Sequence, residues 1–275
     1  MKSILDVKIM KEYVRTCNDG WLQGWHERNG GNLTYRMTQE EVAEVQPFFD
    51  TTPRPWVSIG VQADNLKGEY FITTGSGKFF RNVILDTAAS MGIVEINEEG
   101  DCYRIVWGLT NGAVPTSEFP SHFLNHSVKK AATNGTYRVI YHAHPANLIA
   151  LTYTLPLTNK DITRALWQSA TECPVVFPNG VGVVPWMVPG CADIAKASST
   201  LMKQFDAIVW AHHGLFCAGP TLDITFGLMH TIEKSAEIYV KVMSMTHTVK
   251  QTITDENLRD IAKAFNVKLN EDFLS

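Results

Sequence analysis

The sequence has little charge of one sign and no long basic or apolar run. Its longest Lys/Arg run is Lys129–Lys130, charged residues make up 19%, and the formal net charge is -4. Proteins that bind polyanions usually carry a basic patch or stripe, so nucleic acid is not an expected partner. No stretch approaches the ~20 apolar residues that a membrane helix requires. We therefore expect a chain that binds neither nucleic acid nor a membrane.

Cysteine is scarce, and its spacing excludes several kinds of site. The five cysteines, at positions 17, 102, 173, 191 and 217, are odd in number and form no Cys-x-x-Cys pair. This pattern is typical of reduced thiols in a cytosolic protein rather than of a disulfide framework. Charged residues such as Asp6, Lys8 and Glu12 interrupt the first seventeen residues, which lack the apolar core of a signal peptide. The expected location is the cytoplasm.

The composition is that of a compact folded protein. Hydrophobic residues make up 45% of the chain and aromatic residues 10%, which is too apolar for a disordered protein. We find no internal repeat, low-complexity tract or Gly/Ser-rich linker. The simplest expectation is a single α/β domain over residues 1–275.

Two stretches have helical spacing. Apolar residues recur every three or four positions over Ile9–Trp25, which predicts an amphipathic helix. A longer helix is predicted over Leu222–Met245, with Thr221 as its N-cap and Glu233–Lys234 on a polar face. Short runs typical of strands lie at residues 33–37, 70–73, 93–96, 103–107, 138–141, 183–184 and 207–210.

Histidines at the ends of two of these runs are candidate metal ligands. His142 and His144 follow an apolar run two residues apart, so in a strand both rings project from one face. Another run ends at His212–His213. Three histidines from two strand ends can make an open site that leaves room for substrate or water, as catalytic zinc requires. A hydrogen-bonded pair without a metal explains the spacing of His142 and His144 equally well.

A second pair, His122 and His126, is spaced four residues apart on a predicted helix. This spacing also suits zinc. Polar neighbours such as Asn125, Lys129 and Lys130 indicate a solvated face, which favours the first group of histidines over this pair. The isolated His26, His230 and His247 are predicted to be structural.

Glu118 follows Pro115-Thr116-Ser117, residue types that begin helices, and is predicted near the first turn of a helix. An acidic residue there is common without any chemical role, whereas a poised carboxylate could also act as a general acid or base. The position alone does not decide between the two.

Two glycine-rich turns could hold an anion. Asn29-Gly30-Gly31-Asn32 and Thr74-Gly75-Ser76-Gly77-Lys78 combine exposed backbone N–H groups with small polar side chains, as phosphate-binding loops do. Phe79 stands where a nucleotide-binding P-loop needs Ser or Thr, which excludes that motif. Both segments could equally be tight turns between strands.

Together these motifs resemble the class II aldolase family over roughly residues 10–270. The resemblance is carried by residues 27–33, 74–80, 108–111, 115–118, 142–144 and 213–214, and is strengthened by Ser169-Ala170-Thr171-Glu172-Cys173 and by residues 184–190. Their order and spacing are more specific than any single motif.

The resemblance implies a fold, an activity and a site. The fold would be α/β, a central, mainly antiparallel sheet covered by helices on both faces, in a cyclic homotetramer. The activity would be aldol cleavage of a sugar phosphate, with one Zn²⁺ per subunit held by His142, His144 and His213 and with Glu118 as the acid/base. Phosphate contacts would fall on Asn29, Asn32, Ser76, Gly77, Thr116 and Ser117, and Glu172 would reach the site of a neighbouring subunit. His212 departs from the pattern of the family, in which one histidine precedes the glycine.

Other members of the family remain alternatives. Pentulose-phosphate 4-epimerases use the same kind of zinc triad, fuculose-phosphate aldolases are close relatives, and the adducin head keeps the fold as an assembly module. The three histidines and Glu118 favour an enzyme over an assembly module. The Pro53–Pro55 and Pro185–Pro189 segments and the length of 275 residues favour a longer aldolase over the two shorter enzymes.

Overall fold

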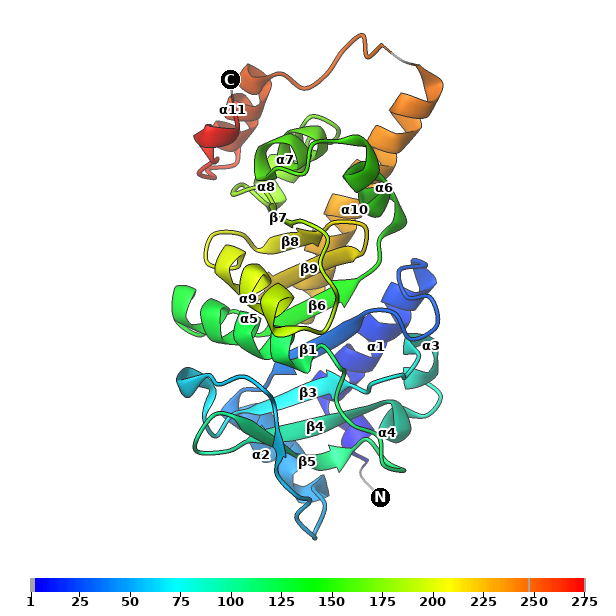
Figure 1. Cartoon of the computed structure of the whole chain (residues 1–275), viewed down its shortest axis with the longest axis vertical. Helices are drawn as coiled ribbons and strands as arrows, with labels where there is room; N and C mark the ends of the chain where they lie inside the picture. The colour runs from blue at the N-terminus through cyan, green and yellow to red at the C-terminus, as the bar shows by residue number, and fades with distance from the viewer. Residues whose placement is uncertain (1–2, 247, 275) are drawn as a thin grey trace.

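The computed structural model describes residues 3–246 and 248–274, and the strands in this part of the chain form one nine-stranded sheet (Figure 1). The strands are β1 (Asn32–Arg36), β2 (Val57–Ser58), β3 (Tyr70–Thr74), β4 (Met91–Ile96), β5 (Cys102–Gly108), β6 (Val139–Ala143), β7 (Gly182–Val184), β8 (Ala207–Trp210) and β9 (Gly214–Gly219). Their order is β2-β5-β4-β3-β1-β6-β9-β8-β7. Every neighbouring pair is antiparallel except β7 and β8, so the prediction of a mainly antiparallel sheet is confirmed.

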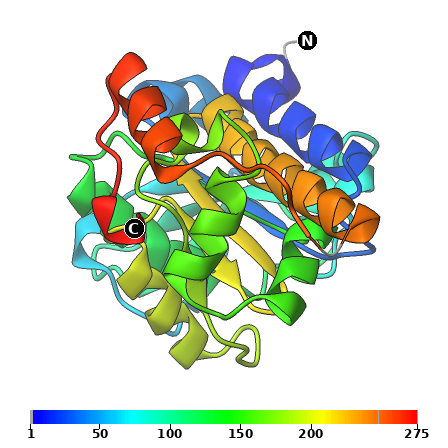
Figure 2. The ribbon, with the colours of Figure 1, turned by 90° about the horizontal axis from the view of Figure 1, so that it is seen from above.

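Helices cover both faces of this sheet, as predicted. The helices are α1 (Lys8–Leu22), α2 (Gln39–Val45), α3 (Phe80–Val83), α4 (Thr87–Ser90), α5 (Phe119–Ala132), α6 (Ala146–Thr154), α7 (Asn159–Trp167), α8 (Cys173–Val176), α9 (Ala192–Leu201), α10 (Leu222–Met245) and α11 (Asp255–Ala264). On one face α1 and α10 lie side by side, and on the other α5 packs beside α9 (Figures 1 and 2). The three-layer arrangement implied by the resemblance is present.

Strand β1 shows how the two faces differ. Leu33 and Tyr35 belong to the main hydrophobic core, where the Tyr13 hydroxyl of α1 donates a hydrogen bond of 2.6 Å to the Leu33 carbonyl. Asn32 and Thr34 alternate with them and meet side chains of α5 instead. Both sets are buried, so the α5 face of β1 is a polar layer inside the protein.

The order of strands brings three chain segments to one end of the sheet. Asn32 at the start of β1 pairs with His142 near the end of β6, because the two strands are antiparallel. His142 also pairs with Phe216 of β9, and β9 begins directly after the turn that contains His213. Residues far apart in the sequence therefore meet at the carboxyl end of β6.

Most predicted elements are present, with small differences at their ends. The predicted first helix is α1, and the long helix is α10 with the Thr221 side chain accepting a hydrogen bond from the N–H of Ile224. The polar face expected at Glu233 is wrong, because this residue is 8% exposed and its carboxylate accepts hydrogen bonds from the N–H groups of Asn147 and Leu148. Glu233 thus stabilises the first turn of α6.

The structure also describes the cysteines and the hydropathy of the helices. All five cysteines are free, as expected of reduced thiols. Within residues 3–246 and 248–274, no helix combines the length and hydropathy needed to cross a bilayer.

Candidate active site

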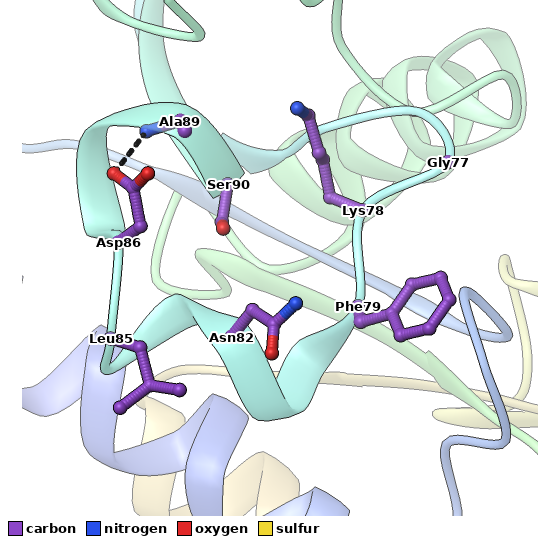
Figure 3. Close-up of a pocket in the computed structure, with 8 residues that line it drawn as sticks. All are labelled: Gly77, Lys78, Phe79, Asn82, Leu85, Asp86, Ala89 and Ser90. Carbon is purple, nitrogen blue, oxygen red and sulfur yellow. Dashed lines mark hydrogen bonds between the residues drawn. The ribbon is translucent and has the colours of Figure 1, made fainter.

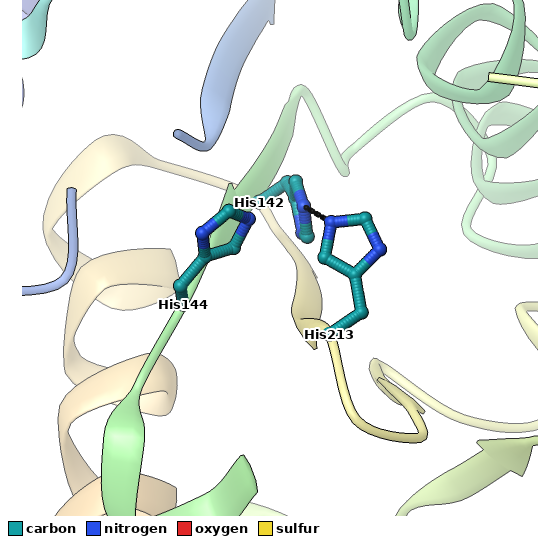
Figure 4. A group of neighbouring side chains, drawn as sticks. All are labelled: His142, His144 and His213. Atoms are coloured by element: carbon teal, nitrogen blue, oxygen red, sulfur yellow. Dashed lines mark hydrogen bonds between the residues drawn. The ribbon is translucent and has the colours of Figure 1, made fainter. Parts of the chain in front are cut away.

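Three histidines lie close enough to share one metal ion (Figure 4). His142, His144 and His213 each offer one ring nitrogen, and these nitrogens all lie within 4.8 Å of one another. His142 Nε2 and His213 Nε2 lie 3.4 Å apart. Two nitrogens bound to one zinc at about 2.0–2.1 Å with tetrahedral angles lie roughly 3.3–3.4 Å apart. The spacing of this pair fits a metal centre.

Hydrogen bonds on the far side of two rings decide which nitrogen faces the centre. His142 Nδ1 donates to the Leu215 carbonyl at 3.1 Å, and His144 Nδ1 donates to Glu27 Oε1 at 2.7 Å. A neutral imidazole that donates from Nδ1 presents a lone pair at Nε2. His144 Nε2 is buried and has no hydrogen-bond partner in the described structure, which is costly unless an ion binds there. The donor set therefore suits a metal ion.

Burial keeps the cluster in the form that binds metal. Desolvation places the pKa of His142 well below its usual value, and the neighbouring His144 and His213 lower it further. Burial likewise lowers the pKa of His213 to about 4. Because imidazole must be neutral to act as a ligand, both rings are ready to bind a metal at neutral pH.

Glycines next to these histidines are required by close packing. Gly214 follows His213, and a Cβ there would lie 2.4 Å from the Ala143 carbonyl oxygen. Gly31 has φ +74°, and a Cβ there would lie 2.4 Å from His26 Nδ1. Both positions reject any side chain, which explains the His-Gly and Asn-Gly-Gly-Asn patterns in physical terms.

Glu118 is buried beside the histidine cluster. It occupies the N-cap position of α5, as predicted from the sequence, and is 8% exposed. Its Oε2 lies 3.6 Å from His142 Nε2 and accepts a hydrogen bond of 2.9 Å from Asn32 Nδ2. Burial raises the pKa of this carboxyl, and the hydrogen bond from Asn32 opposes that effect in part. A buried carboxyl whose pKa is raised is a candidate general acid or base.

The solvated face predicted for His122 and His126 is wrong. His122 is 0% and His126 1% exposed, and both rings bond to the hydroxyl of Thr34, at 2.7 and 2.8 Å. The sequence could not show this, because the partner residue lies about ninety positions away on β1. The pair forms no group of metal ligands in the described structure, where the histidine cluster is the one found.

The predicted phosphate contacts lie on segments that the backbone ties together. The Ser76 N–H donates to the Val114 carbonyl at 2.9 Å, and the Thr116 N–H donates to the Thr74 carbonyl at 3.0 Å. The N–H of Leu33 bonds to the Thr74 hydroxyl at 3.2 Å, which attaches the start of β1 to the same region. Asn29, Gly77 and Ser117 are exposed there, Ser76 is half-buried, and Asn32 and Thr116 are buried.

Glu172 does not join the histidine cluster of its own chain. It is exposed at the N-cap position of α8, a helix that packs against α7, α10 and α11. The metal-ligand group of the described residues does not include it.

The remaining histidines have structural surroundings. His26 is buried, with Nδ1 donating to the Gly30 carbonyl at 2.9 Å and Nε2 accepting from the Tyr141 hydroxyl at 2.7 Å, so it holds the Asn29–Asn32 turn in place. His230 packs edge-on against Trp25. The prediction for His247 falls outside the described residues.

His212, the residue that departs from the family pattern, forms the turn before His213. Its φ is +60°, a conformation that histidine adopts more readily than most residues. Its N–H donates to the Thr152 hydroxyl at 3.0 Å, and its ring lies 4.1 Å from that of Tyr153. His212 therefore anchors the turn to α6 while His213 points at the cluster.

A hollow of about 530 Å³ lies beside the Gly75–Lys78 turn (Figure 3). Its lining comprises Gly77, Lys78, Phe79, Asn82, Leu85, Asp86, Ala89 and Ser90. The carboxylate of Asp86 caps the Ala89 N–H, and none of the three clustered histidines lines the hollow. The candidate metal centre lies outside it.

Comparison with known proteins gives close relatives. The family described as "Class II Aldolase and Adducin N-terminal domain" matches residues 11–240. The rhamnulose-1-phosphate aldolase of Klebsiella pneumoniae subsp. pneumoniae is 48% identical over 98% of this chain and 96% of its own length. The enzyme of the same name from Salmonella heidelberg is 49% identical over 97% of this chain and 96% of its own length.

Solved structures share the fold. A sugar-phosphate aldolase from Thermotoga maritima superposes with a TM-score of 0.71 and 25% identity, covering 88% of this chain and 97% of that one. An L-fuculose 1-phosphate aldolase superposes with a TM-score of 0.61 and 20% identity, covering 97% of this chain and 98% of that one. The second similarity shows the fold alone.

Proposed function

The chain belongs to the class II aldolase and adducin family, and from this premise we propose that it cleaves L-rhamnulose 1-phosphate reversibly to dihydroxyacetone phosphate and L-lactaldehyde. Identities of 48% and 49% to rhamnulose-1-phosphate aldolases over nearly the whole chain support this substrate. The observation that carries the proposal is the placement of Glu118 Oε2 at 3.6 Å from His142 Nε2, within a cluster of three histidines. A ligand set and a proton-transfer group thus share one site.

In this proposal His142, His144 and His213 hold one Zn²⁺ per subunit. The buried, unpartnered Nε2 of His144 and the 3.4 Å separation of the other two Nε2 atoms support a metal there. When bound, zinc supplies a Lewis acid that stabilises the negative charge left on the dihydroxyacetone phosphate fragment. Glu27 and the Leu215 carbonyl hold two of the rings in the orientation that ligation needs.

Glu118 is proposed to transfer the proton. In cleavage the hydroxyl on the carbon that becomes the aldehyde gives up its proton to solvent as the carbon–carbon bond breaks. The electron pair of that bond stays on a carbon of the dihydroxyacetone phosphate fragment, and the protonated carboxyl of Glu118 gives a proton to that carbon. In the synthetic direction the carboxylate removes the same proton. Burial raises the pKa of Glu118 and so favours its protonated form more than in an exposed glutamate, which supports its role as a proton donor.

The phosphate is proposed to bind where the tied segments meet, at Asn29, Asn32, Ser76, Gly77, Thr116 and Ser117. Backbone N–H groups and small hydroxyls of this kind suit a phosphate. Asn32 already donates to Glu118, but an amide nitrogen carries two hydrogens and can also donate to a phosphate oxygen.

We further propose that residues 1–275 form a single domain, and that this domain assembles into cyclic homotetramers in the cytoplasm. In this assembly Glu172 is proposed to act in the site of a neighbouring subunit, as a second catalytic residue. Its exposure and its absence from the cluster of its own chain support this assignment. A cyclic assembly repeats one heterologous contact around a closed axis, so every site would receive one such side chain.

Mixing two inactive variants tests whether Glu172 acts in the site of a neighbouring subunit. Co-refolded Glu118→Gln and Glu172→Ala subunits should regain activity, because some sites then combine an intact Glu118 with an intact Glu172 from another chain. Mass spectrometry verifies that mixed oligomers have formed. If Glu172→Ala alone is inactive and verified mixed oligomers show no gain over either parent, then Glu172 acts within its own subunit.

A substrate panel tests the activity itself. We expect the purified protein to release dihydroxyacetone phosphate from rhamnulose 1-phosphate, and to do so with a higher kcat/KM than from fuculose 1-phosphate or ribulose phosphate. A coupled assay for dihydroxyacetone phosphate measures all three. Faster release from fuculose 1-phosphate, or conversion of ribulose phosphate to an epimer without release, would assign the chain to a different activity of the family.

A further inference from the structure

Buried polar side chains form a hydrogen-bonded chain that leads from Glu118 into the interior of the protein. Asn32 Nδ2 donates to Glu118 Oε2, and Asn32 Oδ1 is hydrogen-bonded to His122 Nε2. His122 Nδ1 bonds to the Thr34 hydroxyl at 2.7 Å, which bonds in turn to His126 Nε2 at 2.8 Å. The chain runs from β1 to α5 and is buried at every residue, the most exposed being Glu118 at 8%. The proposed reaction uses only its first two members.

The hydrogen bonds of this chain have one consistent direction. An ionised Glu118 can only accept, so Asn32 must turn its amide nitrogen to the carboxylate and its carbonyl oxygen to His122. A carbonyl oxygen also only accepts, so His122 Nε2 must carry the hydrogen, and Nδ1 of the neutral ring then accepts from the Thr34 hydroxyl. That hydroxyl, having donated its hydrogen, accepts from His126 Nε2. The four hydrogen bonds of the network are mutually compatible in this direction.

Both histidines are held in the neutral form that this direction needs. Burial lowers the pKa of His122 to about 3, and it lowers that of His126 well below its usual value. The ring of His122 also packs edge-on against Phe216 at 5.3 Å, which restricts its rotation. The ring is therefore fixed both in tautomer and in place.

We propose that His122 is a positioning residue for proton transfer, which acts through Asn32 to hold the Glu118 carboxylate beside the histidine cluster, and that Thr34 and His126 fix the tautomer of His122. The inference rests on the proposed role of Glu118. If a hydrogen bond of this network is lost, the Asn32 amide can rotate and present its oxygen to the carboxylate. Two acceptors then face one another, and the carboxylate loses the donor that holds it in place.

The substitution Thr34→Val breaks the hydrogen-bonded chain at a residue that is not assigned a contact with substrate. Valine has the shape of threonine but cannot donate to His122, and Thr34 is 0% exposed. We expect kcat to fall about tenfold, the lower end of the range for loss of a group that orients site residues, with KM and metal content unchanged. Exchange of a dihydroxyacetone phosphate proton with solvent should slow by the same factor. Thr34→Ser, which keeps the hydroxyl, should restore both rates.

The matched control is Thr225→Val. Thr225 is 1% exposed, and its hydroxyl donates to the carbonyl of Thr221, the N-cap of α10, outside the hydrogen-bonded chain of Glu118. This variant reports what the loss of one buried hydroxyl does by itself. Equal losses of kcat in Thr34→Val and Thr225→Val, or an unchanged kcat in folded Thr34→Val, would overturn the inference.

Hydrogen positions in the wild-type protein give a test that needs no variant. Neutron diffraction from deuterated crystals should place deuterium on His122 Nε2 and none on Nδ1. Deuterium on Nδ1 contradicts the proposed direction, whatever the folding of Thr34→Val. The proposed function fails separately, if Glu118→Gln keeps the wild-type rate of proton exchange, whereas the positioning inference alone fails if only Thr34→Val keeps it.

Discussion

Glu118→Gln should lower kcat by roughly 10²-fold or more, because glutamine keeps the shape of the side chain but cannot transfer a proton. Metal content and the affinity for dihydroxyacetone phosphate should stay at wild-type values, since neither the histidines nor the phosphate loops are changed. The proton exchange of dihydroxyacetone phosphate with solvent reports this step without the aldehyde. Exchange at the wild-type rate in this variant would exclude Glu118 as the acid/base.

The chain offers a close control for this substitution. Glu233 is also 8% exposed, and burial raises its pKa as it does that of Glu118, but its carboxylate caps α6 rather than facing the histidines. Glu233→Gln should lower thermal stability and leave kcat of the folded protein close to the wild-type value. A similar loss of kcat in both variants would mean that the loss of a buried carboxylate, and not of a base, explains the result.

Alanine at His142, His144 or His213 should remove both metal and activity. An open site with three protein ligands that loses one of them binds metal far more weakly, and we expect the content to fall from about one ion per chain to background. Elemental analysis after gel filtration measures the content, and the aldolase assay measures the activity.

The matched control for these variants is the double substitution His122→Ala/His126→Ala. It should keep the metal while lowering kcat, because these two histidines are assigned to the orientation of Glu118. Loss of metal from the double variant, together with its retention in the three single variants, would show that the metal centre had been placed on the wrong histidines.

The fold could be predicted in outline because its strong patterns are local. The apolar stripe of α1 and the N-capped helical pattern of α10 can each be recognised from a few helical turns of sequence. Strand β9 was not predicted, although it pairs with both β6 and β8. Its sequence, Gly-Leu-Phe-Cys-Ala-Gly, is short and lacks both alternation and β-branched residues, so its identity as a strand depends on its neighbours. The three-layer arrangement was predicted from the family resemblance and not from local pattern.

In the candidate site, too, the residues with a local sequence pattern could be predicted and those that depend on distant partners could not. His142 and His144 could be proposed from sequence because they end a recognisable strand-like run. A second such run ends at His212–His213, and the choice of His213 came from the family resemblance. The burial of His122 and His126 could not be predicted, since it depends on pairing with Thr34 across the interface between β1 and α5. The contact between Glu27 and His144, residues 117 positions apart, likewise has no local signal. Long-range polar partners are what the sequence alone does not reveal.

The most direct test of the metal centre is X-ray absorption at the metal edge of the purified, zinc-loaded protein. The structure predicts three imidazole nitrogens at about 2.0–2.1 Å and no sulfur, with one imidazole fewer in any metal retained by His213→Ala. A sulfur shell at about 2.3 Å, or a spectrum that does not change on substitution of any of the three histidines, would contradict a metal centre at His142, His144 and His213.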